Sequence, residues 1–155
     1  MKVCAIMDID GVYTNSKEWE KYIPKENTRE GWDNYHAHYY TSKPNAEMVG
    51  IAKALQKLMP IFFVTSREDI GDMRLFSRAE IESYSAGEVK VDGKYNKLFM
   101  RKKGDFRPSA VVKQEILYKD ILGQGYKPVI AIDDSKSNID MFKENGVGTK
   151  LYTIA

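Results

Sequence analysis

The sequence predicts an α/β fold of three layers, a Rossmann-like, mostly parallel sheet with helices on both faces. Short apolar runs alternate along the chain with longer stretches of helical spacing, which is typical of a parallel sheet. Three of these runs end directly in polar, reactive residues, and ligands bind at the carboxyl ends of strands in such sheets. The 155 residues show no internal repeat and no domain boundary, so one domain over residues 1–155 is expected.

The first predicted strand, residues 3–7, runs into Asp8 and Asp10 and then into Gly11. Two carboxylates at the end of a buried strand cost free energy unless a cation compensates them. Gly11 lets the backbone turn sharply and approach a ligand. A plain Asp-rich turn is the alternative for this stretch taken alone. Cys4, the single cysteine, lies in the strand and is expected to be a buried structural thiol.

Residues 12–44 are polar and aromatic and show no long period, so we expect a flap or cap inserted after the first strand. A short helix is expected within residues 32–40. The aromatic residues either form the core of a small subdomain or offer a surface on which a base or sugar stacks. His36 and His38 lie two apart with no cysteine nearby, which argues against a zinc site.

The remaining elements are delimited by apolar spacing and by Pro, Gly and Ser at their ends. They are helices over 44–58, 69–84, 109–121 and 135–144, and strands over 61–64, 97–100, 128–132 and 149–153. Pro44 is expected in the first turn of its helix, Ser109 as the cap of the next-to-last helix, and Ser135 or Ser137 as the cap of the last. The strand over 61–64 leads into Thr65, Ser66 and Arg67.

Charge and hydropathy exclude some functional classes. The net charge of +2 is too small to indicate nucleic-acid binding by itself. A basic cluster, Arg101, Lys102, Lys103 and Arg107, either forms a solvated face or attracts a phosphate-bearing substrate. No apolar run approaches the ~20 residues of a membrane span, and no signal-peptide pattern opens the chain. We therefore expect a cytoplasmic protein without a membrane partner.

Acidic residues at two strand ends suggest a metal-assisted reaction on a phosphate. The strand over 128–132 ends in a further acidic pair, so four carboxylates converge: Asp8, Asp10, Asp133 and Asp134. A hard divalent cation relieves their repulsion, and an oxygen-only ligand set indicates Mg²⁺. Thr65 can donate to phosphate oxygens, and Lys113 can neutralise charge, although a solvated surface lysine is the alternative. A carboxylate nucleophile would form an aspartyl-phosphate.

These motifs resemble the haloacid dehalogenase (HAD) superfamily of phosphatases. Residues 8–11, Asp-Ile-Asp-Gly, match its first motif, and Thr65, Lys113 and residues 132–135 match the other three in order. The resemblance implies the HAD fold over nearly the whole chain.

The resemblance also implies roles for single residues. Asp8 would be the nucleophile and Asp10 the acid and base. Mg²⁺ would be held by Asp8, the Asp10 backbone carbonyl and Asp134, with Asp133 close by.

A narrower resemblance concerns residues 100–107, Met-Arg-Lys-Lys-Gly-Asp-Phe-Arg, and residues 111–116, Val-Val-Lys-Gln-Glu-Ile. They are similar to the phosphatase half of bacteriophage polynucleotide kinase-phosphatases, which removes 3′-phosphates from DNA or RNA ends. This implies a phosphorylated nucleic-acid end as substrate and, for a phage protein, the host cytoplasm. The residues expected to bind the phosphate or the end are Thr65, Ser66, Arg67 and Lys113. No Gly-x-x-x-x-Gly-Lys-Ser/Thr loop is present, so kinase activity is not expected.

Other functions stay open from sequence alone. A free nucleotide or another small phosphomonoester is a second substrate class. From a different class, a phosphoacceptor module or a binding-only relative would share some of these residues. Receiver modules, however, place the adjacent acidic pair on the first strand, whereas here it comes last. The sequence determines neither the oligomeric state nor the choice between DNA and RNA.

Overall fold

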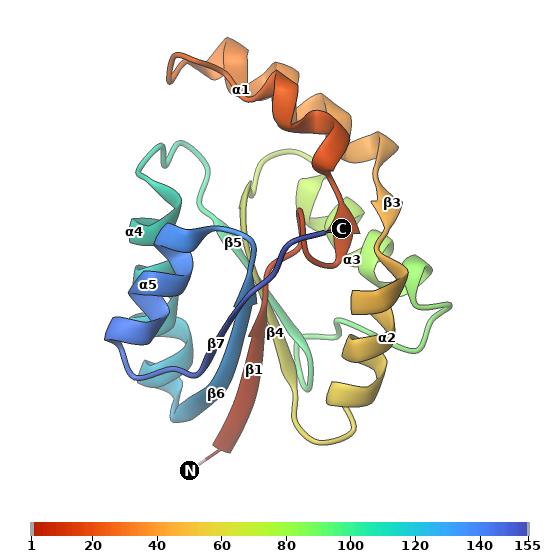
Figure 1. Ribbon diagram of the computed structural model, residues 1–155, viewed down its shortest axis with the longest axis vertical. Coiled ribbons are helices and arrows are strands. Elements are labelled where there is room, and N and C mark those ends of the chain that lie inside the picture. The colour runs from red at the N-terminus through yellow and green to blue at the C-terminus, as the bar shows by residue number, and fades with distance from the viewer. Residues whose placement is uncertain (1, 155) are drawn as a thin grey trace.

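The computed structural model describes residues 2–154, apart from the side chain of Tyr39. A five-stranded parallel sheet in the order β5–β4–β1–β6–β7 forms its centre, with helices on both faces (Figure 1). The strands are β1 Lys2–Met7, β4 Ile61–Glu68, β5 Lys97–Arg101, β6 Tyr126–Asp133 and β7 Thr149–Leu151. The predicted three-layer α/β fold is confirmed.

Two helices cover each face of the sheet. Figure 1 shows α2 and α3 on one side and α4 and α5 on the other. Their bounds are α2 Ala46–Leu55, α3 Met73–Tyr84, α4 Ser109–Ile116 and α5 Lys136–Glu144. The chain continues from α4 through a π-helical turn, Leu117–Ile121, and a 3₁₀ turn, Leu122–Gln124. Gly125 ends this segment with a φ of +82°, which glycine adopts at no steric cost.

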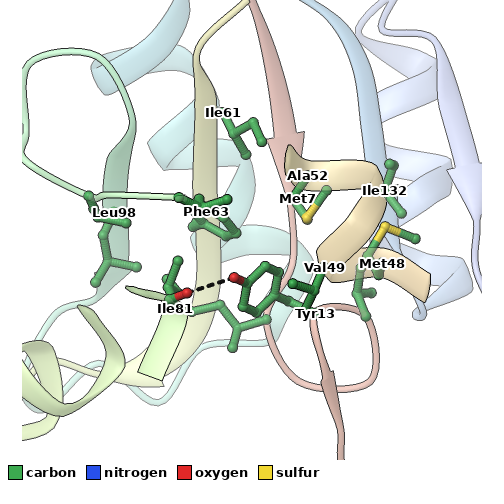
Figure 2. Packing of buried hydrophobic residues seen from close by; sticks show 14 of the residues in the cluster. Met7, Tyr13, Met48, Val49, Ala52, Ile61, Phe63, Ile81, Leu98 and Ile132 are labelled. Carbon is green, nitrogen blue, oxygen red and sulfur yellow. Dashed lines mark hydrogen bonds between the residues drawn. The ribbon is translucent and has the colours of Figure 1, made fainter. Parts of the chain in front are cut away.

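The core consists of two apolar clusters, one on each face of the sheet. Successive strand residues point to opposite faces, so Phe62 packs in the cluster beneath α4 and α5, and Phe63 packs beneath α2 and α3. Figure 2 shows the second cluster, in which the Tyr13 hydroxyl donates to the Ile81 carbonyl at 2.6 Å. Cys4 is fully buried in the first cluster, and burial raises the pKa of its thiol to about 12. It is therefore an inert core residue.

The segment after β1 lies over the carboxyl ends of the strands (Figure 1). Its two ends pair as antiparallel strands β2 Thr14–Asn15 and β3 Lys43–Pro44. Between them lie a 3₁₀ helix, Lys17–Tyr22, helix α1 Arg29–His36 and a second 3₁₀ helix, Ala37–Thr41. The Thr28 side chain caps α1 by accepting from the Gly31 amide, so the helix begins three residues before the predicted range.

The structure corrects the predicted start of α2. Pro44 is not in its first turn, because Pro44 pairs with Thr14 in the small sheet and the helix begins at Ala46. Within the helix, Val49 is buried while Ile51 is exposed.

The predicted cap of α4 is also corrected. Ser109 is the first helical residue and Pro108 precedes it as the cap, so the serine hydroxyl is used elsewhere, in a hydrogen bond with Ser66. Strand β4 extends beyond its predicted end to Glu68, and β7 stops earlier, at Leu151. Among the helices of residues 2–154, none is long and apolar enough to cross a membrane.

Candidate active site

Three adjacent strands bring the predicted site residues to one edge of the sheet. Asp8 directly follows the central strand β1, Thr65 lies in β4 on one side of it, and Asp133 ends β6 on the other. Because the strands are parallel, their carboxyl ends meet. Residues separated by more than 120 positions in sequence are thereby neighbours.

Lys113, from α4, joins two of these carboxylates. Its ammonium donates to Asp8 Oδ1 at 3.0 Å and to Asp133 Oδ2 at 2.7 Å, and the residue is 1% exposed. Burial alone lowers the pKa of Lys113, but the charges of Asp133 and Asp8 outweigh it, so the pKa lies above its ordinary value. The alternative of a solvated surface lysine is wrong.

Asp8 is held in one orientation. Its Oδ1 also accepts from the Ile9 backbone amide at 2.9 Å. Burial and the charge of Asp133 raise the pKa of Asp8 well above its ordinary value, although Lys113 acts in the opposite direction. Asp134 is exposed to solvent, but desolvation by the protein beside it and the charge of Asp133 raise its pKa to about 6. The positive charge of Lys113 therefore does not fully balance the negative charge of these carboxylates.

The donor set fits a hard divalent cation. Oxygens of Asp8, Asp133 and Asp134 lie within 4.8 Å of one another, and carboxylate oxygens are the ligands that Mg²⁺ prefers. Gly11 has a φ of +80°, and a Cβ there would lie 2.1 Å from Asp134 Oδ2, so only glycine admits this carboxylate. Within the described residues, buried Asn138 Oδ1 has no hydrogen-bond partner, and water around a cation would satisfy it.

Arg67, which the resemblance assigns to binding the phosphate or the nucleic-acid end, contacts Asp10 in this structure. Arg67 is fully buried, and its Nε and Nη2 donate to Asp10 Oδ2 at 3.0 Å and Oδ1 at 2.7 Å. The same guanidinium donates to Glu80 and to Ser77. In this arrangement Arg67 acts on the site through Asp10.

A cavity of about 680 Å³ opens over these residues, a size typical of small-molecule sites. Its walls come from the carboxyl ends of the strands, the 3₁₀ helix Lys17–Tyr22, helix α1 and the loop before α4. Lining residues include Asp8, Asp10, Thr65, Ser66, Glu68, Lys113, Asp134, Asn138, Trp32, Tyr35, His36 and Phe106. The predicted residues Thr65 and Ser66 thus face the same space as Asp8 and Lys113.

The two arginines of the basic cluster bond the loop before α4 and the elements beside it. Arg101 donates to the backbone carbonyls of Ser66, Asp105 and Arg107. Arg107 pairs with Asp105 at 2.7 Å and with Glu115 at 2.8 Å. These two arginines therefore hold the loop in shape.

Comparison with known proteins agrees with this geometry. The family model described as the polynucleotide kinase PNKP phosphatase domain matches residues 2–150. The chain belongs to this family. The resemblance to HAD phosphatases and to polynucleotide kinase-phosphatases is confirmed, and with it the prediction of a phosphatase domain.

Solved structures share the fold of this PNKP-family domain. Chains of two structures, the Pnkp1/Rnl/Hen1 complex and the Pnkp1/Rnl/Hen1 RNA repair complex, superpose with TM-scores of 0.66 and 0.67, at 18% and 16% identity. Each match covers 99% of this chain but only 46% and 42% of the other. The haloacid dehalogenase-like hydrolase SP0104 from Streptococcus pneumoniae superposes at 0.59, with 11% identity, over 96% of this chain and 83% of its own. No curated relative matches the sequence.

Sequence reasoning missed several residues of the PNKP-family site. Glu68 is 3% exposed and accepts from both terminal nitrogens of Arg29, at 2.5 and 3.1 Å, and from the Gly104 amide at 2.6 Å. Burial alone raises the pKa of Glu68, but these hydrogen bonds outweigh it, so the pKa lies below its ordinary value. A glutamate directly after Thr65-Ser66-Arg67 was the available signal. No sequence signal pointed to Asn138, because it lies inside a stretch of helical spacing.

Proposed function

We propose that this domain is a Mg²⁺-dependent phosphomonoesterase that forms an aspartyl-phosphate and acts on 3′-phosphorylated ends of DNA or RNA. The observation that carries the proposal is the placement of Asp8 on the cavity floor, bonded to buried Lys113 and beside two further acids. Family membership supports phosphatase chemistry. The matched chains of an RNA repair complex support a nucleic-acid end as substrate.

In the first step Asp8 attacks phosphorus. Its Oδ1 is bonded to Ile9 and Lys113, so Oδ2 forms the new bond to phosphorus while the bond from phosphorus to the 3′ oxygen breaks. We assign Asp10 to protonate that leaving oxygen. Arg67 bonds both Asp10 oxygens and holds the carboxylate in one orientation, while a second lone pair on each oxygen can take the proton.

In the second step water attacks the phosphorus of the aspartyl-phosphate. Asp10 takes a proton from this water, inorganic phosphate leaves, and the Asp8 carboxylate is restored. Lys113 and the hydroxyl of Thr65 stabilise the charge on the transferring group. Ser66 lines the same cavity and extends the set that binds the phosphate.

Asp8, Asp134 and the Asp10 backbone carbonyl would hold Mg²⁺, with Asp133 beside them. When bound, the ion supplies positive charge that neutralises the phosphoryl oxygens. We further propose that residues 12–44 act as a cap of one phosphatase domain, because the segment lies over the strand ends and lines the cavity.

A phosphate-release panel tests the function. Purified protein with Mg²⁺ is offered the same oligonucleotide with a 3′-phosphate or a 5′-phosphate, and nucleoside 3′- and 5′-monophosphates. We expect release from the 3′-phosphorylated oligonucleotide and its loss on addition of a chelator. If phosphate is released only from mononucleotides, the proposed substrate class changes from nucleic-acid ends to free nucleotides. The cavity volume also suits a free nucleotide.

A further inference from the structure

The part of the cavity wall contributed by α1 is aromatic. Trp32, Tyr35 and His36, here called the aromatic face, occur at helical positions i, i+3 and i+4 and therefore lie on one side of α1. Trp32 contacts Tyr35 edge to face at 5.7 Å and lies 5.9 Å from His36. All three line the cavity, and no residue of α1 is fully buried. Tyr35 also packs against the core cluster beneath α2 and α3, but among the described residues neither core cluster includes Trp32 or His36, so packing in the core does not account for those two rings.

The aromatic face is held in place. Trp32 Nε1 donates to Asn27 Oδ1 at 2.8 Å. Arg29 bonds Glu68 and lies 4.7 Å above the ring of Phe106, a further lining residue, from the loop before α4. These contacts connect the two aromatic parts of the wall before any ligand binds, which lowers the cost of ordering them on binding.

The aromatic face is also close to the acids. Burial is the main reason that the pKa of Tyr35 lies above its ordinary value, and the charges of Asp10, Asp134 and Asp8 add to it. A phosphate on Asp8 and a ring against α1 would thus occupy one cavity. A single nucleotide has this arrangement of phosphate and ring.

We infer that the aromatic face and Phe106 bind the nucleobase of the terminal nucleotide by stacking. The inference rests on the proposed function and names the part of the substrate that the cavity recognises. Every base has a π face, so stacking accepts any of the four. Arg101 and Arg107 also line the cavity, but they bond backbone carbonyls, Asp105 and Glu115, so the attraction for a nucleobase is assigned to the rings.

The test compares two single-stranded oligonucleotides of identical sequence. One ends in an ordinary nucleoside 3′-phosphate, and the other carries its 3′-phosphate on a terminal tetrahydrofuran residue without a base. We expect the wild-type KM to be about tenfold higher for the abasic end, with kcat changed less than threefold. Trp32→Ala and Phe106→Ala should each raise KM about tenfold on the ordinary end and leave KM on the abasic end nearly unchanged. Trp32→Phe should restore most of the difference.

Tyr40→Ala is the matched control, because Tyr40 lies on the same inserted segment, is 59% exposed and does not line the cavity. It should leave both KM values unchanged. If Trp32→Ala lowers the melting temperature, Phe106→Ala decides the matter, since Phe106 is 43% exposed in a loop. Equal wild-type KM values on the two ends would overturn the inference and leave the proposed function intact. No release from either oligonucleotide would instead refute the proposed function.

Discussion

At the floor of the cavity, the buried ammonium of Lys113 donates to the buried carboxylates of Asp8 and Asp133, whereas helix α1 above them contains no fully buried residue. The carboxylates of the floor lie at the ends of central strands that have an apolar cluster on each face. The aromatic face is held by the bond between Arg29 and Glu68, by the bond from Trp32 to Asn27, and by the small β2–β3 sheet at the ends of the segment. This difference indicates that the floor carries out the catalytic step and that α1 contributes to substrate binding. Substitutions in the floor should therefore change turnover, and those around α1 should change KM.

Asp8→Asn should have the largest effect. We expect turnover to fall at least about a thousandfold, because an amide oxygen is a poor nucleophile toward phosphorus. The fold should persist, since Asn keeps the shape and the carbonyl that accepts from Ile9 and Lys113. Phosphate release and thermal melting measure the two effects. Turnover near the wild-type rate would refute the role of Asp8 as nucleophile.

Gly11→Ala should damage the floor through Asp134. The new Cβ would meet Asp134 Oδ2 at 2.1 Å, so we expect the affinity for Mg²⁺ to fall about 10- to 100-fold. Gly146→Ala is the control, because Gly146 has a similar φ of +77° with nothing within 4 Å of its added Cβ. Both variants carry the same backbone strain, and isothermal titration with Mg²⁺ distinguishes them. Equal affinities would show that the contact with Asp134 is unimportant.

The pH dependence of stability tests whether the floor needs a cation. In metal-free protein we expect the contribution of the floor carboxylates to the free energy of unfolding to fall as the pH rises from about 4 to about 6.5. The folded protein binds more protons than the unfolded chain in this range, because desolvation and Asp133 raise the pKa of Asp134 from 3.8 to about 6. Asp134 alone should contribute about 1 kcal/mol, since solvent reaches it and screens its charge. Asp8, whose pKa is raised as well, adds in the same direction.

Urea denaturation at the two ends of this range, with a chelator, measures the slope. Saturating Mg²⁺ should reverse the slope, because the ion binds ionised carboxylates. Asp134→Asn should reduce the slope in metal-free protein. Glu68 and Asp105, whose pKa values are lowered, act in the opposite direction in both proteins, so the comparison with Asp134→Asn decides. Equal slopes in the two metal-free proteins would contradict an excess of negative charge in the floor.

The same contrast explains how far the sequence could be interpreted. The floor was predictable because Asp8, Thr65 and Asp133 directly follow or end apolar runs, and parallel strands bring such endings together. Pro44 was misassigned because its conformation is set by pairing with Thr14, thirty residues away, which local propensity does not contain. Arg29 and Glu68 lie still further apart, 39 residues, and no motif connects them.

The smallest effect should come from that pair. Glu68→Gln removes the charge that Arg29 and the Gly104 amide contact, and so loosens the link between α1 and the loop before α4. We expect KM for the 3′-phosphorylated oligonucleotide to rise about threefold with kcat unchanged, because a partly exposed ion pair contributes about 1 kcal/mol or less. Glu88→Gln is the control, since Glu88 pairs with Lys53 at 2.7 Å and neither residue lines the cavity. If Glu68→Gln lowers kcat instead and leaves KM unchanged, then the position of α1 affects the chemical step, and the division between floor and aromatic face fails.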